Sequence, residues 1–385
     1  MIIGIDIRTL MDKEYSGVSW YTQGLLTEIL RQDKINEYRL FYNSGRDISS
    51  RISNIGIRKS DNVKIVATRC PNKFFNYFLQ KICRWPKLDR IGGEVDLFWS
   101  PHFNFTSLSV GVKNILTIHD LSFIVHPDFF SARQNSWHKF LGIKKLIERA
   151  DIIIAISENT KADLIRYFGA AGDKIKVIYS GVGGEFRPLE NNQAELNSVK
   201  EKYSLPERFI LNVGAFEPRK NLSGLISAFD SIADQPGMGE WQLVLAGSKG
   251  WKNKEIFQTI AQAKNKSRIK AIGYVEKNER VALYNSAKIF AYPSFYEGFG
   301  LPVLEAMACG TPVIASDVSS LPEVAGDAAL LVDPHDENSI GQALQLLMRD
   351  DKLRQLYSAR GLNRAKNFSW QKSAGKYLKI LNSEF

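Results

Sequence analysis

Short apolar runs rich in β-branched residues recur along the chain and alternate with longer segments of helical periodicity. This alternation predicts parallel sheets with helices on both faces. Seven strands are predicted in the first half, at residues 2–7, 39–42, 63–67, 97–100, 114–118, 152–156 and 176–179. Six more are predicted in the second half, at residues 209–213, 242–246, 269–272, 289–291, 312–315 and 329–332.

The two series of strands predict two doubly wound α/β domains. A chain of 385 residues is too long for one core of ordinary size, since cores rarely grow past about 250 residues. A Gly-rich turn ending at Pro188 and the polar stretch after it separate the series, so we expect the domains at 1–188 and 189–365. Parallel sheets bind ligands beyond the carboxyl ends of their strands, and we therefore expect the chemistry between the two halves.

Composition restricts the class of protein. Hydrophobic residues make up 44% and charged residues 24% of the chain, which is typical of a globular protein. No apolar run approaches the roughly 20 residues that a membrane-spanning helix needs, and the N-terminus does not read as a signal peptide. The three cysteines, Cys70, Cys83 and Cys309, form no metal or disulfide pattern. We expect a cytoplasmic protein.

The formal net charge of +10 leaves three interpretations open. Such an excess favours polyanionic surfaces, either acidic lipid headgroups or nucleic acid, and it also suits small molecules that carry phosphate. It can equally serve solubility alone.

Two adjacent cations, Arg219 and Lys220, lie where the strand at 209–213 turns into a helix that begins near Leu222. The first amides of a helix already favour an anion. A planar guanidinium and a compact ammonium could together neutralise a departing diphosphate. The alternative is a pair of solvated surface cations.

Two acids, Glu297 and Glu305, flank a Gly-Phe-Gly turn and the start of a helix that Pro302 suits. Paired carboxylates also occur in glycoside hydrolases. A hydrolase pair needs no cationic turn and no anion-binding helix start, whereas an enzyme acting on a nucleotide sugar needs both. For Glu305 the alternative is compensation of the helix dipole.

Two further positions follow strands of the first half. His119 and Asp120 come where the strand at 114–118 ends, so His119 could bond a donor sugar or phosphate and Asp120 could orient the acceptor. A structural hydrogen-bonding corner is the alternative. Gly17 opens a helix after the first strand and would let backbone amides approach a phosphate or an acceptor, although a plain turn also explains it.

Together these segments resemble the retaining family 4 glycosyltransferases, especially the bacterial mannosyltransferase-like members. The resemblance covers nearly the whole chain and rests on the combination of segments. They are Ser-Gly-Val-Ser-Trp-Tyr at 16–21, Thr-Ile-His-Asp-Leu at 117–121, Ala-Ile-Ser-Glu-Asn-Thr-Lys at 155–161, Val-Gly-Ala-Phe-Glu-Pro-Arg-Lys-Asn at 213–221, Gly-Tyr-Val at 273–275, the segment 297–305, and Gly-Thr-Pro-Val-Ile-Ala-Ser at 310–316.

The resemblance implies a GT-B fold, in which two Rossmann-like domains face each other and a C-terminal helix, about 366–385, crosses back to the first. It implies that the second domain binds the donor and the first the acceptor. The donor-binding residues would be Gly17, Gly214, Arg219, Lys220, Val275, Glu297, Phe299, Gly300, Leu301 and Glu305. The residues closest to catalysis would be His119, Arg219, Lys220 and Glu297, with Asp120 and Ser157 on the acceptor side.

The implied reaction is transfer of a hexose, with mannose from GDP-mannose preferred, to a glycan or a polyprenyl-diphosphate-linked acceptor in cell-surface polysaccharide synthesis. The anomeric configuration would be retained without a protein nucleophile. No Asp-x-Asp signature is found in the sequence, so we expect no metal and no cofactor. One departure is Gly214-Ala215, where many members have Gly-Arg, which puts part of the phosphate contact in doubt.

A segment that mixes aromatic and basic residues, 73–90, predicts an amphipathic helix that either lies at an anionic membrane surface or covers its own domain. Three rival functions remain open. A nucleotide-sugar 2-epimerase or a phosphorylase would share the architecture. A nucleic-acid-binding protein would share the charge, but no recognisable module and no continuous basic stripe supports it.

Overall fold

The computed structural model describes residues 1–11, 15–45, 61–189 and 192–384. It divides into two compact units. The first comprises residues 1–121, 136–181 and 370–385, and the second comprises residues 122–135 and 182–369. The chain passes from the first unit to the second at Gly181–Val182, a few residues before the expected boundary at 188.

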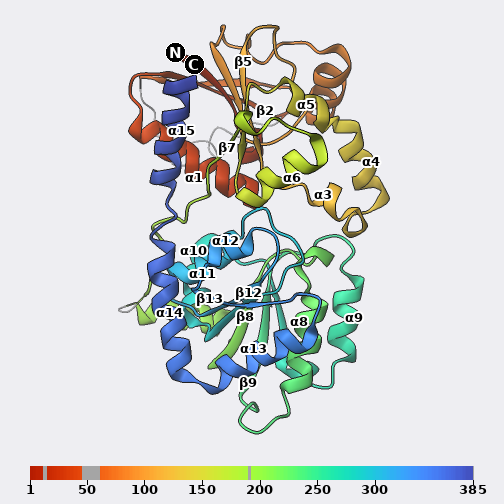
Figure 1. Cartoon of the computed structure of the whole chain (residues 1–385), viewed down its shortest axis with the longest axis vertical. Helices are drawn as coiled ribbons and strands as arrows, with labels where there is room; N and C mark the ends of the chain where they lie inside the picture. The colour runs from red at the N-terminus through yellow and green to blue at the C-terminus, as the bar shows by residue number, and fades with distance from the viewer. Residues whose placement is uncertain (12–14, 46–60, 190–191, 385) are drawn as a thin grey trace. The chain divides into compact units, whose positions relative to one another are not determined.

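The first unit contains a seven-stranded parallel sheet in the order β3-β2-β1-β4-β5-β6-β7 (Figure 1). Its strands are β1 (Ile2–Asp6), β2 (Glu37–Asn43), β3 (Val63–Thr68), β4 (Leu97–Ser100), β5 (Lys113–Ile118), β6 (Ile152–Ala155) and β7 (Ile175–Val177). The order reverses at β1, which has β2 on one side and β4 on the other. A reversal of this kind is the usual ligand position in an open parallel sheet.

The second unit contains a six-stranded parallel sheet in the order β10-β9-β8-β11-β12-β13. Its strands are β8 (Arg208–Val213), β9 (Trp241–Ala246), β10 (Ile269–Gly273), β11 (Ile289–Tyr292), β12 (Val313–Ser316) and β13 (Ala329–Val332). Every strand predicted from the sequence coincides with one of the strands in the two sheets.

Helices connect the strands in both units. In the first half of the chain they are η1 (Arg8–Met11), α1 (Gly17–Gln32), η2 (Phe74–Cys83), α3 (Ser122–Val125), η3 (Pro127–Phe129), α4 (Ala132–Leu141), α5 (Ile143–Arg149), α6 (Glu158–Phe168) and η4 (Gly172–Lys174). In the second half they are α7 (Gln193–Lys202), η5 (Pro218–Lys220), α8 (Leu222–Ile232), α9 (Lys254–Gln262), η6 (Lys266–Arg268), α10 (Lys277–Ser286), α11 (Leu301–Ala308), α12 (Leu321–Ala325), α13 (Glu337–Arg349), α14 (Asp351–Ala365) and α15 (Trp370–Glu384).

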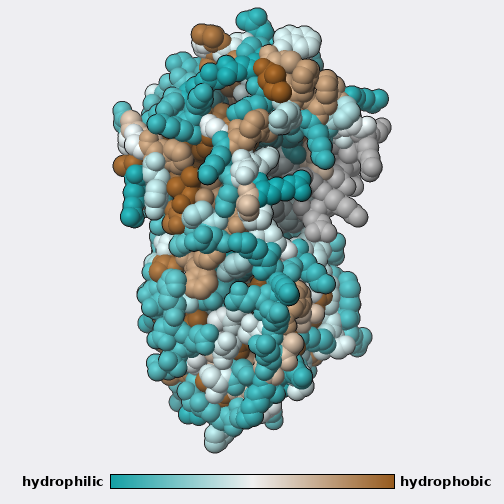
Figure 2. Space-filling view, turned by 90° about the vertical axis from the view of Figure 1, so that its right-hand side faces the viewer, coloured by the Kyte–Doolittle hydropathy of each residue, from teal (hydrophilic) through white to brown (hydrophobic). Residues whose placement is uncertain are grey.

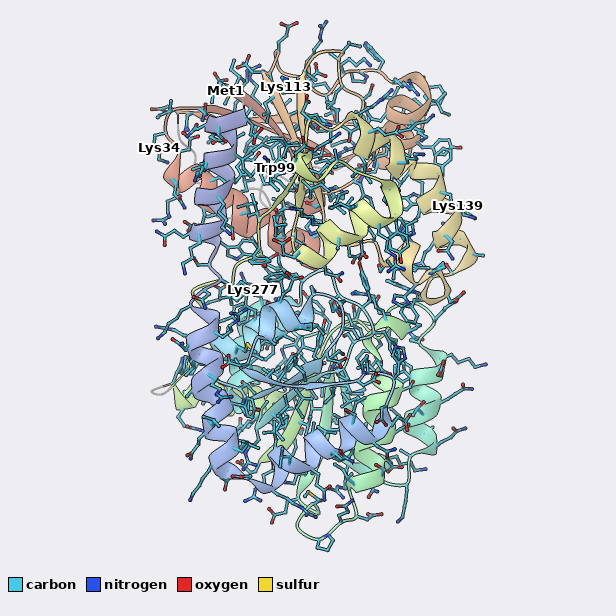
Figure 3. The ribbon with its side chains drawn as sticks, viewed as in Figure 1. Met1, Lys34, Trp99, Lys113, Lys139 and Lys277 are labelled. Atoms are coloured by element: carbon cyan, nitrogen blue, oxygen red, sulfur yellow. The ribbon has the colours of Figure 1, made fainter. Side chains whose placement is uncertain are left out.

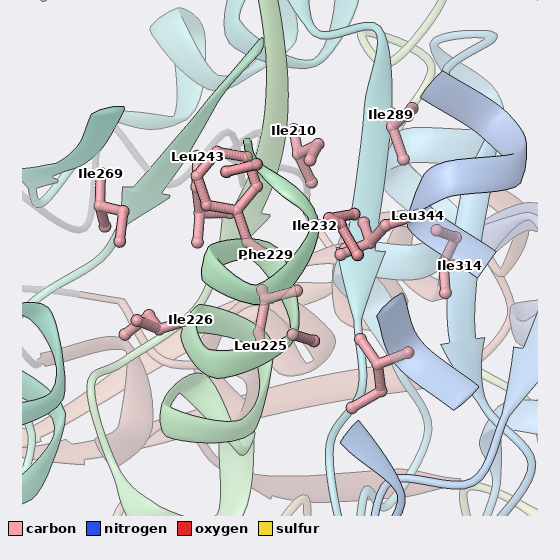
Figure 4. Close-up of a cluster of buried hydrophobic side chains, with 14 of the residues drawn as sticks. Ile210, Leu225, Ile226, Phe229, Ile232, Leu243, Ile269, Ile289, Ile314 and Leu344 are labelled. Atoms are coloured by element: carbon pink, nitrogen blue, oxygen red, sulfur yellow. The ribbon is translucent and has the colours of Figure 1, made fainter. Parts of the chain in front are cut away.

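Helix α8 illustrates how the hydrophobic pattern builds the second core. Leu225, Ile226, Phe229 and Ile232 recur at helical spacing, and all four are buried with Leu344 of α13 beside the sheet (Figure 4). Burying an aliphatic or aromatic side chain of this size contributes about 1.5–3 kcal/mol. This packing holds the start of α8, and with it the preceding turn, against the sheet.

The last helix, α15, belongs to the first unit although the segment before it belongs to the second. It packs along α1 (Figure 1), and the ring of Trp370 lies edge-on against Tyr21. A Cβ at Gly24 would lie 2.4 Å from the Trp370 ring, so the close approach of the two helices requires glycine there. Trp99 of β4, buried inside the unit (Figure 3), contacts Tyr377 of the same helix.

Segment 122–135 groups with the second unit, whereas the sequence places it within 1–188. Aromatic contacts explain the assignment. The ring of Phe130 stacks on Trp251, and the indole Nε1 of Trp251 donates to the carbonyl of Phe129 at 2.8 Å.

Hydrophilic residues cover most of the face in Figure 2, and hydrophobic residues are gathered in separate patches. In the described residues, no helix combines the length and apolarity that crossing a bilayer requires.

Candidate active site

The two cations predicted at a strand-to-helix turn lie there, in η5 between β8 and α8. Neither is a solvated surface group. The Arg219 guanidinium pairs with Glu217 at 2.8 Å and with Glu297 at 2.7 Å. The Lys220 ammonium is buried and lies 2.6 Å from both the Glu297 carboxylate and the Tyr292 hydroxyl. The surface alternative raised for this turn is therefore wrong.

Glu297 joins the two cations, because its two carboxylate oxygens accept from different partners. Burial opposes ionisation of this carboxyl, but Arg219 and Lys220 outweigh burial and hold its pKa at about 2. Burial and the neighbouring guanidinium lower the pKa of Lys220, and Glu297 acts in the opposite direction. With Glu217 included, two carboxylates balance two cations.

The loop that carries Glu297 is fixed by three serines at and after the end of β12. Ser316 donates to the carbonyl of Ser294 at 2.6 Å, and Ser320 donates to the carbonyl of Glu297 at 2.9 Å. The Glu297 amide donates to Ser319 at 3.0 Å. The loop is also tied to the cationic turn, since the Phe295 amide donates to the Arg219 carbonyl. The position of the Glu297 carboxylate is thus set by backbone bonds on both sides.

Gly300 precedes α11 with a φ of 106°, a conformation that favours glycine. A Cβ there would lie 2.6 Å from the side chain of Leu321. The neighbouring Phe299 is buried and packs edge-on against Phe368, while Leu301 begins the helix and is half-buried. The sharp turn predicted from Gly-Phe-Gly is present, and it brings the helix start directly after the Glu297 loop.

Glu305 lies one turn into α11 and faces a different set of partners from Glu297. Its carboxylate accepts from the Tyr284 hydroxyl at 2.9 Å and from Arg280 at 3.4 Å, both on α10. Burial raises the pKa of Glu305, and Arg280 and Tyr284 only partly offset it. The two acids are therefore in two separate clusters, one strongly ionised and one held toward its neutral form.

Two other predicted donor residues, Gly214 and Val275, follow strands of the second sheet. Gly214 ends β8, and its amide donates to the Ala246 carbonyl at 2.9 Å. A Cβ on Gly214 would lie 3.5 Å from the Lys220 side chain. The aliphatic part of Lys220 therefore passes directly over the glycine. Val275, which follows β10, is buried.

The sequence did not predict the side chains that form hydrogen bonds and ion pairs with the predicted site residues. Glu217 could have been noticed, because it lies two residues before Arg219. Tyr292 and Tyr284 carried no signal, since each reads as an ordinary core aromatic of a strand or helix. Arg280 likewise looks like one more cation on a polar helix.

His119 lies at the end of β5 in the first unit and is half-buried. Its Nε2 lies 2.8 Å from the Pro101 carbonyl, and since a carbonyl only accepts, Nε2 carries the hydrogen. Burial lowers the pKa of His119, while Pro101 and Asp120 oppose that change. A neutral ring then leaves Nδ1 as an acceptor for a ligand hydroxyl.

Ser157 is fully buried and caps α6, where it accepts from the Thr160 amide at 3.0 Å. It also donates to the Thr160 hydroxyl, which in turn donates to the carbonyl of His119. Ser157 is thus connected to the backbone of His119 through Thr160. Asp120 is half-buried beside His119, and Gly17 begins α1 with no atom within 4 Å of a Cβ placed on it.

The geometry of the second unit defines its chemistry. An ammonium has three N–H donors, and within the described part of the chain Lys220 uses two of them, on Tyr292 and Glu297. The third remains for a ligand at a turn that holds two fixed positive charges. A buried, preorganised cation pair stabilises an anion whose charge grows during a reaction.

Family descriptions match almost all of the chain. "Glycosyltransferase Family 4" matches residues 16–184, and "Glycosyl transferases group 1" matches residues 193–364. A solved sucrose-phosphate synthase from Thermosynechococcus elongatus shares the fold, with a TM-score of 0.76 and 22% identity over 100% of this chain and 99% of the other. The two parallel-sheet units therefore have the GT-B fold of nucleotide-sugar glycosyltransferases.

Sequence relatives define the family further. The O-antigen chain mannosyltransferase B of Escherichia coli is 35% identical over 67% of this chain and 67% of its own length. The serotype-specific mannosyltransferase WbdA of Escherichia coli is 34% identical over 68% of this chain, a match that spans only 32% of the longer relative. The chain therefore belongs to the family 4 glycosyltransferases.

Proposed function

We propose that this glycosyltransferase moves mannose from GDP-mannose to a glycan or lipid-linked saccharide in the synthesis of a cell-surface polysaccharide, with retention at the anomeric carbon. The observation that carries the proposal is the pair of cations formed by the half-buried Arg219 and the buried Lys220, both held by Glu297. The choice of mannose is supported by the names of the relatives, one an O-antigen chain mannosyltransferase and the other a serotype-specific mannosyltransferase.

The reaction breaks the bond between the anomeric carbon and the diphosphate oxygen and forms a bond from that carbon to the acceptor oxygen. The acceptor hydroxyl attacks on the side from which the diphosphate leaves, and its proton passes to an oxygen of that diphosphate. The leaving group gains negative charge, which Arg219 and Lys220 stabilise. Glu297 orients these cations and bonds a hydroxyl of the sugar, while Glu305 bonds the ribose.

The cation pair takes the place of a divalent metal in this proposal. We therefore expect no metal or other cofactor to be required. Rigorous chelation should leave the rate of transfer unchanged, and a rate that falls with chelator and returns with Mg²⁺ would contradict this part.

Donor identity is tested by thermal shift with GDP, UDP, GDP-mannose, UDP-glucose, UDP-galactose and UDP-N-acetylglucosamine. A ligand that binds only the folded state raises the melting temperature, so GDP and GDP-mannose should give the largest rise. Transfer to a mannose-ended acceptor, followed by NMR of the new anomeric proton, tests retention. A larger rise in melting temperature with the uridine compounds would exclude guanosine as the base of the donor. Consumption of the donor without an acceptor would favour a 2-epimerase.

We also propose that the first unit binds an anionic membrane surface, where a lipid-linked acceptor would be found. Helix η2 buries Phe75 but exposes Phe74, Tyr77 and Phe78. Phe74 stacks on Phe78, and Tyr77 stacks on Phe140 of α4. The other strongly exposed apolar residues of this surface are Ile82, Trp85 and Trp137.

Exposed cations occur on or next to the same helices, namely Lys73 and Arg84 at the two ends of η2, Lys139 in α4 (Figure 3) and Lys144 in α5. Aromatic residues that enter the interface and cations that meet acidic headgroups favour membrane binding together. Co-sedimentation with phosphatidylglycerol vesicles at low salt should exceed that with phosphatidylcholine vesicles. Phe74→Ser with Phe78→Ser should lower it at least fivefold, and equal binding to both lipids would contradict the proposal.

A further inference from the structure

A polar cavity of about 190 Å³ lies in the first unit, beyond the carboxyl ends of β1, β2, β3 and β4. The side chains that matter for its chemistry are Arg8, Asn43, Asn72, Asn76, His102 and Asn104. It is located beside β1, where the strand order reverses and ligands bind in open parallel sheets. Its volume is below the roughly 300–1,000 Å³ of sites for drug-sized molecules, which suits one small ring.

Three asparagines that line this cavity have the same arrangement of hydrogen bonds. Asn72 accepts from Asn43 at 2.6 Å, Asn76 accepts from Arg8 at 2.6 Å, and Asn104 accepts from the Phe105 amide at 2.8 Å. In each case the protein occupies the amide oxygen. Across the described ranges, none of the three Nδ2 groups donates a hydrogen bond to the protein, so three neutral donors remain for a ligand.

The positive charge of Arg8, which lines the cavity, is neutralised by another residue of the protein. Arg8 forms a buried ion pair with Asp6, whose two carboxylate oxygens accept from its Nε and Nη2. Further bonds to Asn76 and to the Phe105 carbonyl occupy the guanidinium. Asp6 therefore offsets the charge of Arg8, and among the described residues of the wall no uncompensated cation is left to hold a phosphate.

His102 adds an atom without a partner. Its Nδ1 is buried, and no described residue forms a hydrogen bond with it. Burial lowers the pKa of His102 to about 4, with Arg8 and His119 adding to the effect and Asp6 opposing it. The ring is neutral near pH 7, and its Nδ1 needs a ligand atom that can pair with a neutral nitrogen, which a hydroxyl does.

We propose that this cavity binds one uncharged sugar unit of the acceptor glycan, through the Asn72, Asn76 and Asn104 amides and the His102 ring. Hydroxyl and ring oxygens accept from the three amide groups, and one hydroxyl pairs with His102. The role as an acceptor subsite rests on the proposed function, whereas the preference for a neutral sugar rests on the cavity alone.

Two isosteric substitutions test the assignment in the full chain. Asn72→Asp and Asn76→Asp each keep an oxygen for the Asn43 or Arg8 donor, and each replaces the NH₂ donor with a carboxylate oxygen that carries a negative charge and can only accept. The matched control is Asn338→Asp, an exposed position in α13 of the second unit. Methyl α-mannoside, methyl α-glucoside, mannose 6-phosphate and inorganic phosphate are titrated separately and followed by saturation-transfer NMR.

We expect a neutral glycoside to bind the wild type and the control equally, and each cavity variant at least tenfold more weakly. Phosphate should not compete. Binding that survives both cavity substitutions, tighter binding of mannose 6-phosphate or phosphate, or no glycoside binding at all would overturn the inference.

GDP is titrated into the same samples as a separate readout. Intact GDP binding in the two variants shows that the second unit is folded. A circular dichroism spectrum and a melting temperature equal to those of the control show that the first unit is folded as well, so that the cavity assignment can fail alone. If glycoside binding is lost as expected while GDP and GDP-mannose never bind, the proposed donor fails and the neutral-sugar cavity remains.

Discussion

The Lys220 ammonium lies 2.6 Å from the Glu297 carboxylate, and both groups are buried. Removing one member of a buried ion pair costs about 3–5 kcal/mol, because the remaining charge loses its partner. The same removal leaves Glu217 alone to balance the two cations at the donor turn, and the one uncompensated positive charge favours an added diphosphate.

Glu297→Gln should therefore lower the melting temperature of the free protein and make GDP raise it more than in the wild type. Transfer should fall at least a hundredfold, since the two cations and the sugar lose a common ligand. Thermal shift and initial rates measure the two effects. Weaker GDP stabilisation in the variant would show that Glu297 does not compete with the diphosphate.

Acid stability should also depend on Glu297. Its folded pKa of about 2 is below the ordinary value of 4.5, so the stability it contributes is complete above pH 4.5 and is lost as the pH falls toward 2. This loss amounts to about 2–4 kcal/mol. Urea unfolding at pH 6, 5, 4 and 3 should show a smaller loss in Glu297→Gln than in the wild type, and parallel curves would contradict the ion-pair account.

Ionisation of Glu305 should have the opposite effect on stability from ionisation of Glu297. Burial raises the pKa of Glu305, so its charged form is costly near pH 7, and Glu305→Gln should leave the stability unchanged or raise it. Binding of the ribose should weaken at least tenfold. The ratio of affinities for GDP and 2′,3′-dideoxy-GDP separates the effects, because the variant should discriminate between them less than the wild type. An unchanged ratio would place the ribose elsewhere.

Two glycines form a matched pair. Gly300→Ala places a Cβ at a φ of 106° and 2.6 Å from the buried Leu321, and should cost about 2–4 kcal/mol. Gly17→Ala meets no atom within 4 Å and should leave the melting temperature unchanged, yet lower transfer at least tenfold if a ligand fills the space ahead of α1. Full activity in a folded Gly17→Ala variant would show that Gly17 is not part of the ligand site.

The fold was predictable because buried positions recur along the sequence with the period of a strand or a helix. Most strands are short runs rich in β-branched and other apolar residues, such as β6 (IIIA) and β12 (VIAS), and helix α8 shows its buried stripe directly. The grouping of residues 122–135 was not predictable, since it depends on contacts such as Phe130 with Trp251. Such long-range pairs have no local pattern.

The site was predictable only where its residues are close in sequence. Arg219 and Lys220 are adjacent, and Glu297 lies beside a Gly-rich turn. Their mutual contact, the separation of Glu305 into a second cluster and the role of Tyr292 depend on how β8 and β11 pair in the sheet. The asparagine cavity collects residues from the ends of four strands, so no single motif contains it.

The docking of α15 on α1 has a consequence for how the protein is made. The strands of the first unit are among the first 177 residues, but the helix that covers Trp99 and Tyr21 begins at Trp370. During synthesis a ribosome therefore completes the whole second unit while the first still has an uncovered apolar surface. Translation that stops early would leave a nascent chain prone to aggregation and recognisable by chaperones.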